Sequence, residues 1–331
     1  MLNDKLELKA LVTGASGFIG GRLRDALLDA GADVVAIRRP SSPQPKRGRS
    51  AVAAYDDERA LARIMREEKP DLLFHVAGAT KGVSYDDFQR ANVMPTVNLI
   101  TAVKQEHPEL SRFVMVSSLT SYGPSKPAAP HTESSPRRPI EHYGKSKQEA
   151  EERLEAEGDD LRWTILRPGG VYGPGDGDFF ALFREASKGR NVFYGNRKRL
   201  SSVVYVDDLV RACVNCTKTD ASLSKGYFIC DGEPITWENF QQLIVDSAGR
   251  RVFSLDLPEF LVGVAALGGE IATKIDKKPR LFNRQKAKMG AQEAWTCVHD
   301  AAREDFGYEP EVPVREGVKR AFAWYREHGW L

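Results

Sequence analysis

Hydrophobic and polar positions along the first half of the chain alternate between two spacings. Short, continuous apolar runs predict buried strands at 10–12, 34–37, 72–76, 113–116 and 163–166. Between these runs, apolar residues recur every three or four positions and predict helices over 18–30, 61–65, 92–104 and 143–157. Strands that alternate with helices in this way are typical of βαβ units and a parallel sheet.

The alternation weakens after Pro168. Runs at 203–206 and 227–230 still predict strands, whereas from Trp237 onward the pattern is helical and irregular, and 40–50 and 124–139 are predicted loops. We therefore expect an α/β fold, a Rossmann-type doubly wound parallel sheet with a smaller, mostly helical C-terminal substrate lobe. The expected nucleotide-binding domain is 1–174 with 201–230, and the expected lobe is 175–200 with 231–331.

Composition narrows the class of protein. The 331 residues are 41% hydrophobic, which is enough for a core, and the net charge of +2 argues against a nucleic-acid binder. Four cysteines do not make a disulfide framework, and their spacing predicts no metal site. The longest uncharged apolar run, 260–269, is shorter than the roughly 20 residues of a transmembrane helix. We expect a soluble, cytoplasmic protein.

A glycine-rich turn follows the first predicted strand and opens the first predicted helix. The turn reads TGASGFIG over 13–20, with glycines at 14, 17 and 20. Such glycines allow a tight turn, close approach of the backbone to a pyrophosphate, and close packing of helix on sheet. The free N–H groups of the helix N-terminus then bind phosphate. The turn predicts a dinucleotide site.

The end of the second predicted strand bears on which dinucleotide binds. An acidic residue there would bind the ribose 2′-hydroxyl of NAD, but this chain has Arg38 and Arg39. Guanidinium groups pair well with phosphate. We therefore favour NADP(H), with Arg38 as the main contact, and keep NAD(H) as the alternative.

Tyr143 and Lys147 lie four residues apart on a predicted helix, so they share one face. Ser118 follows the strand at 113–116, 25 residues before the tyrosine. Serine, tyrosine and lysine in this order suit carbonyl–alcohol chemistry. A nearby ammonium is expected to lower the pKa of the phenol, which then exchanges protons near neutrality, while the serine holds the substrate oxygen.

With these motifs the chain resembles the extended short-chain dehydrogenase/reductase superfamily, of the NAD-dependent epimerase/dehydratase type. The resemblance covers nearly the whole chain and rests on TGASGFIG (13–20), FHVAGAT (74–80), VSSLTSYG (116–123), YGKSK (143–147), LRPGGVYGPGD (166–176) and VVYVDDLV (203–210). It implies an NAD(P)-dependent oxidoreductase with Ser118, Tyr143 and Lys147 as catalytic residues. Many members dimerise through the helices near 92–104 and 143–157, so the resemblance also implies a homodimer.

The resemblance further implies which residues bind the cofactor and the substrate. The cofactor set is Gly14, Ser16, Gly17, Phe18, Ile19, Gly20, Arg38, Arg39, Asp56, Ala77, Gly78, Ala79, Asn92, Ser117, Tyr143, Lys147, Pro168 and Val171. The substrate set is Thr80, Lys81, Ser118, Thr120, Tyr143 and Arg199.

Two positions depart from the family pattern. Members usually carry an aspartate after the third strand to read adenine, whereas this chain has Ala54, followed by Tyr55 and Asp56. Sugar-nucleotide 4,6-dehydratases carry Thr-Asp-Glu where this chain has 118–120, Ser-Leu-Thr. The missing acid pair disfavours elimination chemistry.

Three functions remain open from the sequence. We favour an NADPH-dependent reductase of a hydrophobic ketone, similar to the dihydroflavonol-reductase and 3β-hydroxysteroid-dehydrogenase branch. The apolar segment 257–267 is a candidate wall of its pocket, although an ordinary core helix explains it as well. The alternatives are a nucleotide-sugar epimerase with tightly bound NAD and a non-catalytic NADP(H) sensor. Segment 277–288 carries six basic residues and no acid, compatible with weak peripheral membrane contact but more typical of a solvated face.

Overall fold

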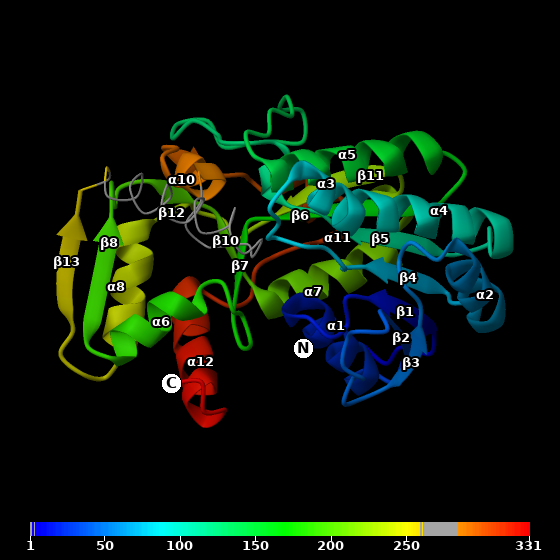
Figure 1. Ribbon diagram of the computed structural model, residues 1–331, viewed down its shortest axis with the longest axis horizontal. Helices are drawn as coiled ribbons and strands as arrows, with labels where there is room; N and C mark the ends of the chain where they lie inside the picture. Colours follow the sequence, from blue (N-terminus) through cyan, green and yellow to red (C-terminus); the bar gives the residue numbers. More distant parts are fainter. Residues whose placement is uncertain (1, 3, 259, 261–283) are drawn as a thin grey trace.

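A seven-stranded parallel sheet forms the centre of the molecule (Figure 1). The computed structural model describes the chain except residues 1, 3, 259 and 261–283. The strand order is β11–β6–β5–β4–β1–β2–β3, and each neighbouring pair is parallel. The strands are β1 (Lys9–Thr13), β2 (Asp33–Arg38), β3 (Arg49–Val52), β4 (Leu72–His75), β5 (Arg112–Val116), β6 (Trp163–Pro168) and β11 (Lys225–Ile229). This confirms the predicted doubly wound α/β fold.

Helices cover both faces of this sheet, which explains the nearly continuous apolar runs of its strands. Along β1, Leu11 packs into one buried cluster while Ala10 and Val12 pack into the other, because successive side chains point to opposite faces. The first face carries α2 (Glu58–Glu68), α4 (Met94–Glu106) and α5 (His142–Glu157). The second carries α1 (Phe18–Asp29), α7 (Val206–Asn215) and α11 (Asp300–Phe306).

A second lobe lies beside the sheet (Figure 1). Phe183, Phe240 and Phe322 join three of its helices in a buried aromatic cluster. The lobe's helices are α6 (Phe180–Ser187), α8 (Trp237–Ser247), α10 (Arg284–Gly290) and α12 (Val314–Glu327). Its short strands are β7 (Gly170–Tyr172), β8 (Arg190–Tyr194), β9 (Leu200–Ser201), β10 (Val203–Tyr205), β12 (Ile235–Thr236), β13 (Phe253–Leu257) and β14 (Ala294–Trp295).

Several segments differ from the expectation. Strand β3 begins at Arg49, inside the predicted loop 40–50. The sequence pattern did not predict this strand, because it lies at the edge of the sheet and carries too few apolar residues to show a period. Helix α11 belongs to the range expected for the lobe, yet its Ala302 packs into the core beneath the sheet. Most of the segments 257–267 and 277–288 lie outside the described residues. Within the described chain, no helix has the length and apolar character needed to span a membrane.

Candidate active site

The site begins where β1 and β4 end, side by side in the sheet. The hydroxyl of Thr13, the last residue of β1, accepts hydrogen bonds from the backbone N–H groups of Val76 and Ala77 at 3.1 and 3.0 Å. These bonds hold the segment after β4 against the glycine turn after β1. The chain changes direction across the sheet between these two strands. Parallel α/β sheets bind ligands at such a point.

The glycine turn requires glycine at two of its positions. Gly14 has φ +71°, and a Cβ there would lie 2.8 Å from the backbone nitrogen of Ala77. A Cβ on Gly20 would lie 2.3 Å from the carbonyl oxygen of Gly14. Helix α1 begins at Phe18, and no side chain caps its N-terminus. Ser16 and Gly17 are exposed, and Phe18 and Ile19 are half-buried. This cradle fits a pyrophosphate.

Arg38, the last residue of β2, presents an unsatisfied donor beside the turn. Its Nη1 donates to the carbonyl oxygen of Ser42 at 3.2 Å, but its Nε is buried and has no hydrogen-bond partner. A buried donor without a partner is costly, and an anion would relieve that cost. Arg39 and Asp56 are exposed. The end of β2 therefore offers a guanidinium donor that an anion would satisfy.

The segment after β4 is fixed by Asn92. The Asn92 side chain accepts a hydrogen bond from Ala79 N at 2.7 Å and donates to Ala79 O at 3.1 Å and Ser146 Oγ at 2.8 Å. Asn92 sits in a π-helical turn, Gln89–Val93, that precedes α4. It therefore ties residues 77–79 to α5. Ser117 likewise turns inward, and its hydroxyl donates to the buried carboxylate of Glu151.

Ser118, Tyr143 and Lys147 meet at the carboxyl end of β5. Ser118 lies close enough to the phenol of Tyr143 to affect its pKa. The Ser118 hydroxyl accepts hydrogen bonds from the backbone N–H and the hydroxyl of Thr120 at 3.2 and 2.9 Å. Lys147, one turn further along α5, is buried and donates from Nζ to the carbonyl oxygen of Val116 at 2.9 Å. The i, i+4 spacing on α5 thus brings Tyr143 and Lys147 to the segment 116–118, at and just after the end of β5.

Glu141 places the start of α5. Its buried carboxylate accepts hydrogen bonds from the backbone N–H groups of Tyr143 and Gly144, both at 2.6 Å. These bonds satisfy two of the free donors of the first helical turn. Glu141 is a site residue that the sequence pattern had not indicated, although an acceptor just before a predicted helix is a recognisable capping signal.

Burial dominates the electrostatics of this cluster. Burial raises the pKa of Tyr143 above its usual value near 10. Ser118 opposes this shift, and the carboxylates of Glu141 and Asp178 add to it. Burial lowers the pKa of Lys147 to about 8, and the Glu151 carboxylate opposes that shift. The sequence predicted a phenol acidified by Lys147. In the structure the pKa of the phenol moves the other way, because desolvation disfavours phenolate.

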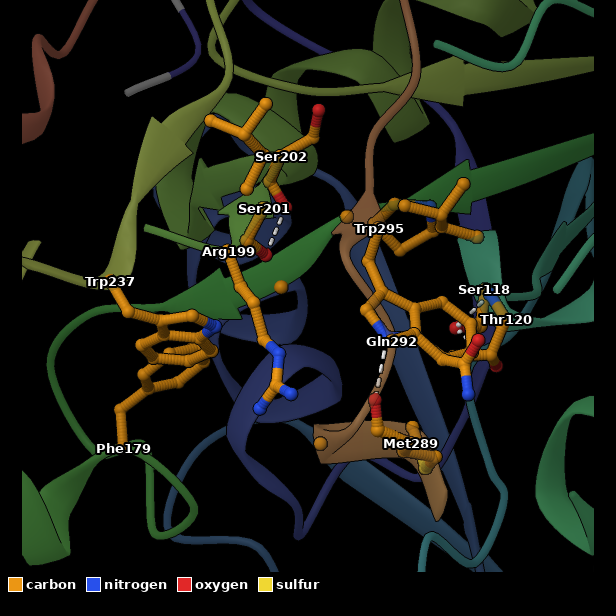
Figure 2. Close-up of a pocket in the computed structure, with 16 residues that line it drawn as sticks. Ser118, Thr120, Phe179, Arg199, Ser201, Ser202, Trp237, Met289, Gln292 and Trp295 are labelled. Carbon is orange, nitrogen blue, oxygen red and sulfur yellow. Dashed lines mark hydrogen bonds between the residues drawn. The ribbon is translucent and has the colours of Figure 1, made fainter. Parts of the chain in front are cut away.

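A cavity of about 250 Å³ opens beside Ser118. Figure 2 shows Phe179 and Trp237 along one side, Trp295 with Gln292 and Met289 along the other, and Arg199 extending between them. The rings of Phe179 and Trp237 stack with centroids 6.1 Å apart, and Trp295 Nε1 donates to the carbonyl oxygen of Met289 at 3.0 Å. The cavity therefore offers aromatic walls with one guanidinium among them.

The structure brings some of the predicted substrate residues together and separates others. Ser118, Thr120 and Arg199 line the cavity, as does Pro168 of the predicted cofactor set, whereas Tyr143 is not among its described lining residues. Thr80 and Lys81 are exposed, and Lys81 forms an ion pair with Asp178 at 2.9 Å. The three aromatic walls were missed because they come from separate segments of the lobe, where no motif marks them.

The fold and the site together define an α/β dinucleotide-binding enzyme of the short-chain dehydrogenase/reductase type. The sequence profile of the NAD dependent epimerase/dehydratase family matches residues 10–229, and the chain belongs to this family. It is therefore an NAD(P)-dependent oxidoreductase of this family, as the sequence predicted.

Relatives within the family have different activities. The chain is 27% identical to a 2-alkyl-3-oxoalkanoate reductase of Stenotrophomonas maltophilia, over 95% of this chain and 98% of the relative. It is also 27% identical to a UDP-glucose 4-epimerase of Mycolicibacterium smegmatis, over 96% and 99%. Its fold is similar to that of the UDP-glucose 4-epimerase of Thermotoga maritima, with a TM-score of 0.80, 23% identity, and coverage of 97% and 99%.

Proposed function

We propose that this protein is an NADP(H)-dependent reductase of a hydrophobic ketone, or the corresponding secondary-alcohol dehydrogenase. The observation that carries the proposal is that Ser118 lines the aromatic cavity and also lies against the phenol of Tyr143. A carbonyl group in that cavity would contact the Ser118 hydroxyl, with the Tyr143 phenol next to that serine. Acyl and steroid-like ketones suit walls of this kind.

The chain's own residues supply binding and proton transfer. A bound nicotinamide dinucleotide supplies or accepts the hydride. The hydroxyls of Ser118 and Tyr143 bind the carbonyl oxygen and stabilise the negative charge that develops on it. Because burial raises the pKa of Tyr143, its phenol is protonated at neutral pH and donates its proton to that oxygen during reduction. Lys147, whose Nζ donates to Val116 O at the end of β5, would hold the ribose.

Arg38 supports NADP(H) over NAD(H). Its buried, unpartnered Nε and its neighbour Arg39 suit the 2′-phosphate that distinguishes the two cofactors. No carboxylate follows β2 directly to bind a 2′-hydroxyl. In this assignment the glycine turn and α1 hold the pyrophosphate, and residues 77–79 with Pro168 and Val171 face the nicotinamide.

A nucleotide-sugar epimerase with bound NAD is the second candidate. Arg199 in the cavity and the likeness to UDP-glucose 4-epimerases favour it. A sugar-nucleotide diphosphate needs several cations, however, and the nearby guanidinium of Arg197 pairs with Asp256 and lies over the Phe193 ring. Arg199 amid three aromatic rings suits an amphipathic ketone better.

Tyr143→Phe tests the proposal. With NADPH and a panel of hydrophobic ketones, loss of the proton donor should lower kcat by about 10²- to 10⁴-fold. NADPH affinity, measured by fluorescence titration, should stay within about twofold. Tyr227→Phe is the matched control, because it removes a phenol that bonds Asp305 far from the site. Turnover of UDP-sugars by protein that carries bound NAD, or an absence of turnover in the native protein, would refute the reductase.

A further inference from the structure

Tyr55 bridges the glycine turn and the second strand of the sheet. Its phenol oxygen accepts a hydrogen bond from the backbone N–H of Gly14 at 3.2 Å and donates one to the carbonyl oxygen of Ile37 at 3.2 Å. Gly14 lies 41 positions before Tyr55 and Ile37 lies 18 before it. A single hydroxyl thus joins the carboxyl ends of β1 and β2 from the loop after β3.

The Tyr55 side chain is held in this position from both ends. Its ring is half-buried and packs against the cluster that contains Leu11 and Val35. The carbonyl oxygen of the same residue accepts a hydrogen bond from Asn98 Nδ2, on α4, at 2.7 Å. The phenol is therefore held in a fixed position at the carboxyl ends of β1 and β2.

The position of this bridge relates it to one half of the cofactor. The carboxyl ends of β1, β2 and β3 form one side of the point at which the sheet reverses its order, and Arg38 lies at the end of β2. Ser118, Tyr143 and Lys147 lie beyond β4, on the other side of that point. The bridge thus lies on the side of the 2′-phosphate contact, away from the reacting groups.

We propose that Tyr55 is a positioning residue for the adenosine half of the cofactor, in a chain that has Ala54 and no carboxylate directly after β3. The inference rests on the proposed function. Tyr55 acts through backbone atoms: its hydroxyl holds Gly14 of the phosphate-binding turn in place against β2. Without the hydroxyl, both backbone groups lose their partner. Ordering the turn then takes part of the binding free energy of the cofactor.

Tyr55→Phe isolates the hydroxyl, because the ring and its packing remain. We expect the affinities for NADPH, NADH and 2′,5′-ADP, measured by calorimetry, to fall by the same factor of about three to ten, the range of one neutral hydrogen bond. The factor is shared because Tyr55 contacts the turn that every dinucleotide uses, whereas the 2′-phosphate contact is assigned to Arg38. The KM for NADPH should rise with kcat unchanged.

Two further variants make the result decisive. Tyr55→Leu removes the ring as well and should weaken binding further, while Tyr227→Phe, distant from the turn, should bind 2′,5′-ADP as the native protein does. Native affinity in Tyr55→Phe would overturn the inference, even if its melting temperature falls, because the hydroxyl would then serve stability alone. A native protein that binds neither NADPH, NADH nor 2′,5′-ADP would overturn the proposed function itself.

Discussion

If Arg38 binds the 2′-phosphate as proposed, replacing it with glutamine should remove the preference for NADPH over NADH. The guanidinium has one donor held by Ser42 O and one buried donor without a partner. A hydrogen bond to a charged group contributes about 1.5–3 kcal/mol. If the 2′-phosphate takes one such bond, its loss weakens NADPH binding by roughly 10- to 150-fold. NADH lacks that phosphate, so its affinity should change by less than about twofold.

Fluorescence titration of both reduced cofactors measures this selectivity directly. Arg47→Gln is the control, because Arg47 is exposed and pairs with Asp29 on α1 rather than with the end of β2. Arg38→Asp should go further and favour NADH, since a carboxylate suits the ribose 2′-hydroxyl. An equal loss for NADPH and NADH, or an unchanged ratio, would show that Arg38 does not read the phosphate.

The remaining predictions concern pH and backbone geometry. Because burial lowers the pKa of Lys147 to about 8, the lysine loses its charge as the pH rises through 8, and the rate of ketone reduction should fall over that range in a pH profile of kcat. Between that pKa and the ordinary value near 10.4 the folded protein binds fewer protons than the unfolded chain, so the contribution of Lys147 to stability should rise with pH in denaturant titrations. An activity that stays flat from pH 7 to 10 would contradict the assignment. Gly20→Ala would place a Cβ 2.3 Å from Gly14 O and should cost about 1–3 kcal/mol of unfolding free energy and most cofactor binding. Gly177→Ala, where nothing lies within 4 Å of the added Cβ, should leave both nearly unchanged, and equal behaviour of the two variants would remove the steric argument.

Features with a local signal were predictable from the sequence. The glycine turn is contiguous, and Tyr143 and Lys147 share a helix face, so their proximity follows from helical geometry alone. Glu141 caps the same helix two residues before the tyrosine, and it was within reach of the same reasoning. The pKa of Tyr143 was beyond it, because its direction depends on how deeply the phenol is buried.

Features assembled from distant segments had no such signal. Phe179, Trp237 and Trp295 form the walls of one cavity although they come from three separate parts of the chain. Their meeting depends on how α8 and the short strands of the lobe pack, and two-residue strands such as β9 and β12 are too short to show a period. Tyr55 likewise differs from any other tyrosine only through its contacts with Gly14 and Ile37.

The sequence by itself determined the parallel α/β sheet, the phosphate-binding turn and the family, because each depends on residues that are close along the chain and on burial patterns with a fixed period. Only the tertiary structure decided which aromatic rings enclose the cavity, that burial raises the pKa of the Tyr143 phenol, and that a hydroxyl after β3 joins the first two strands. These depend on distances and desolvation between segments far apart in the chain, which no local pattern encodes.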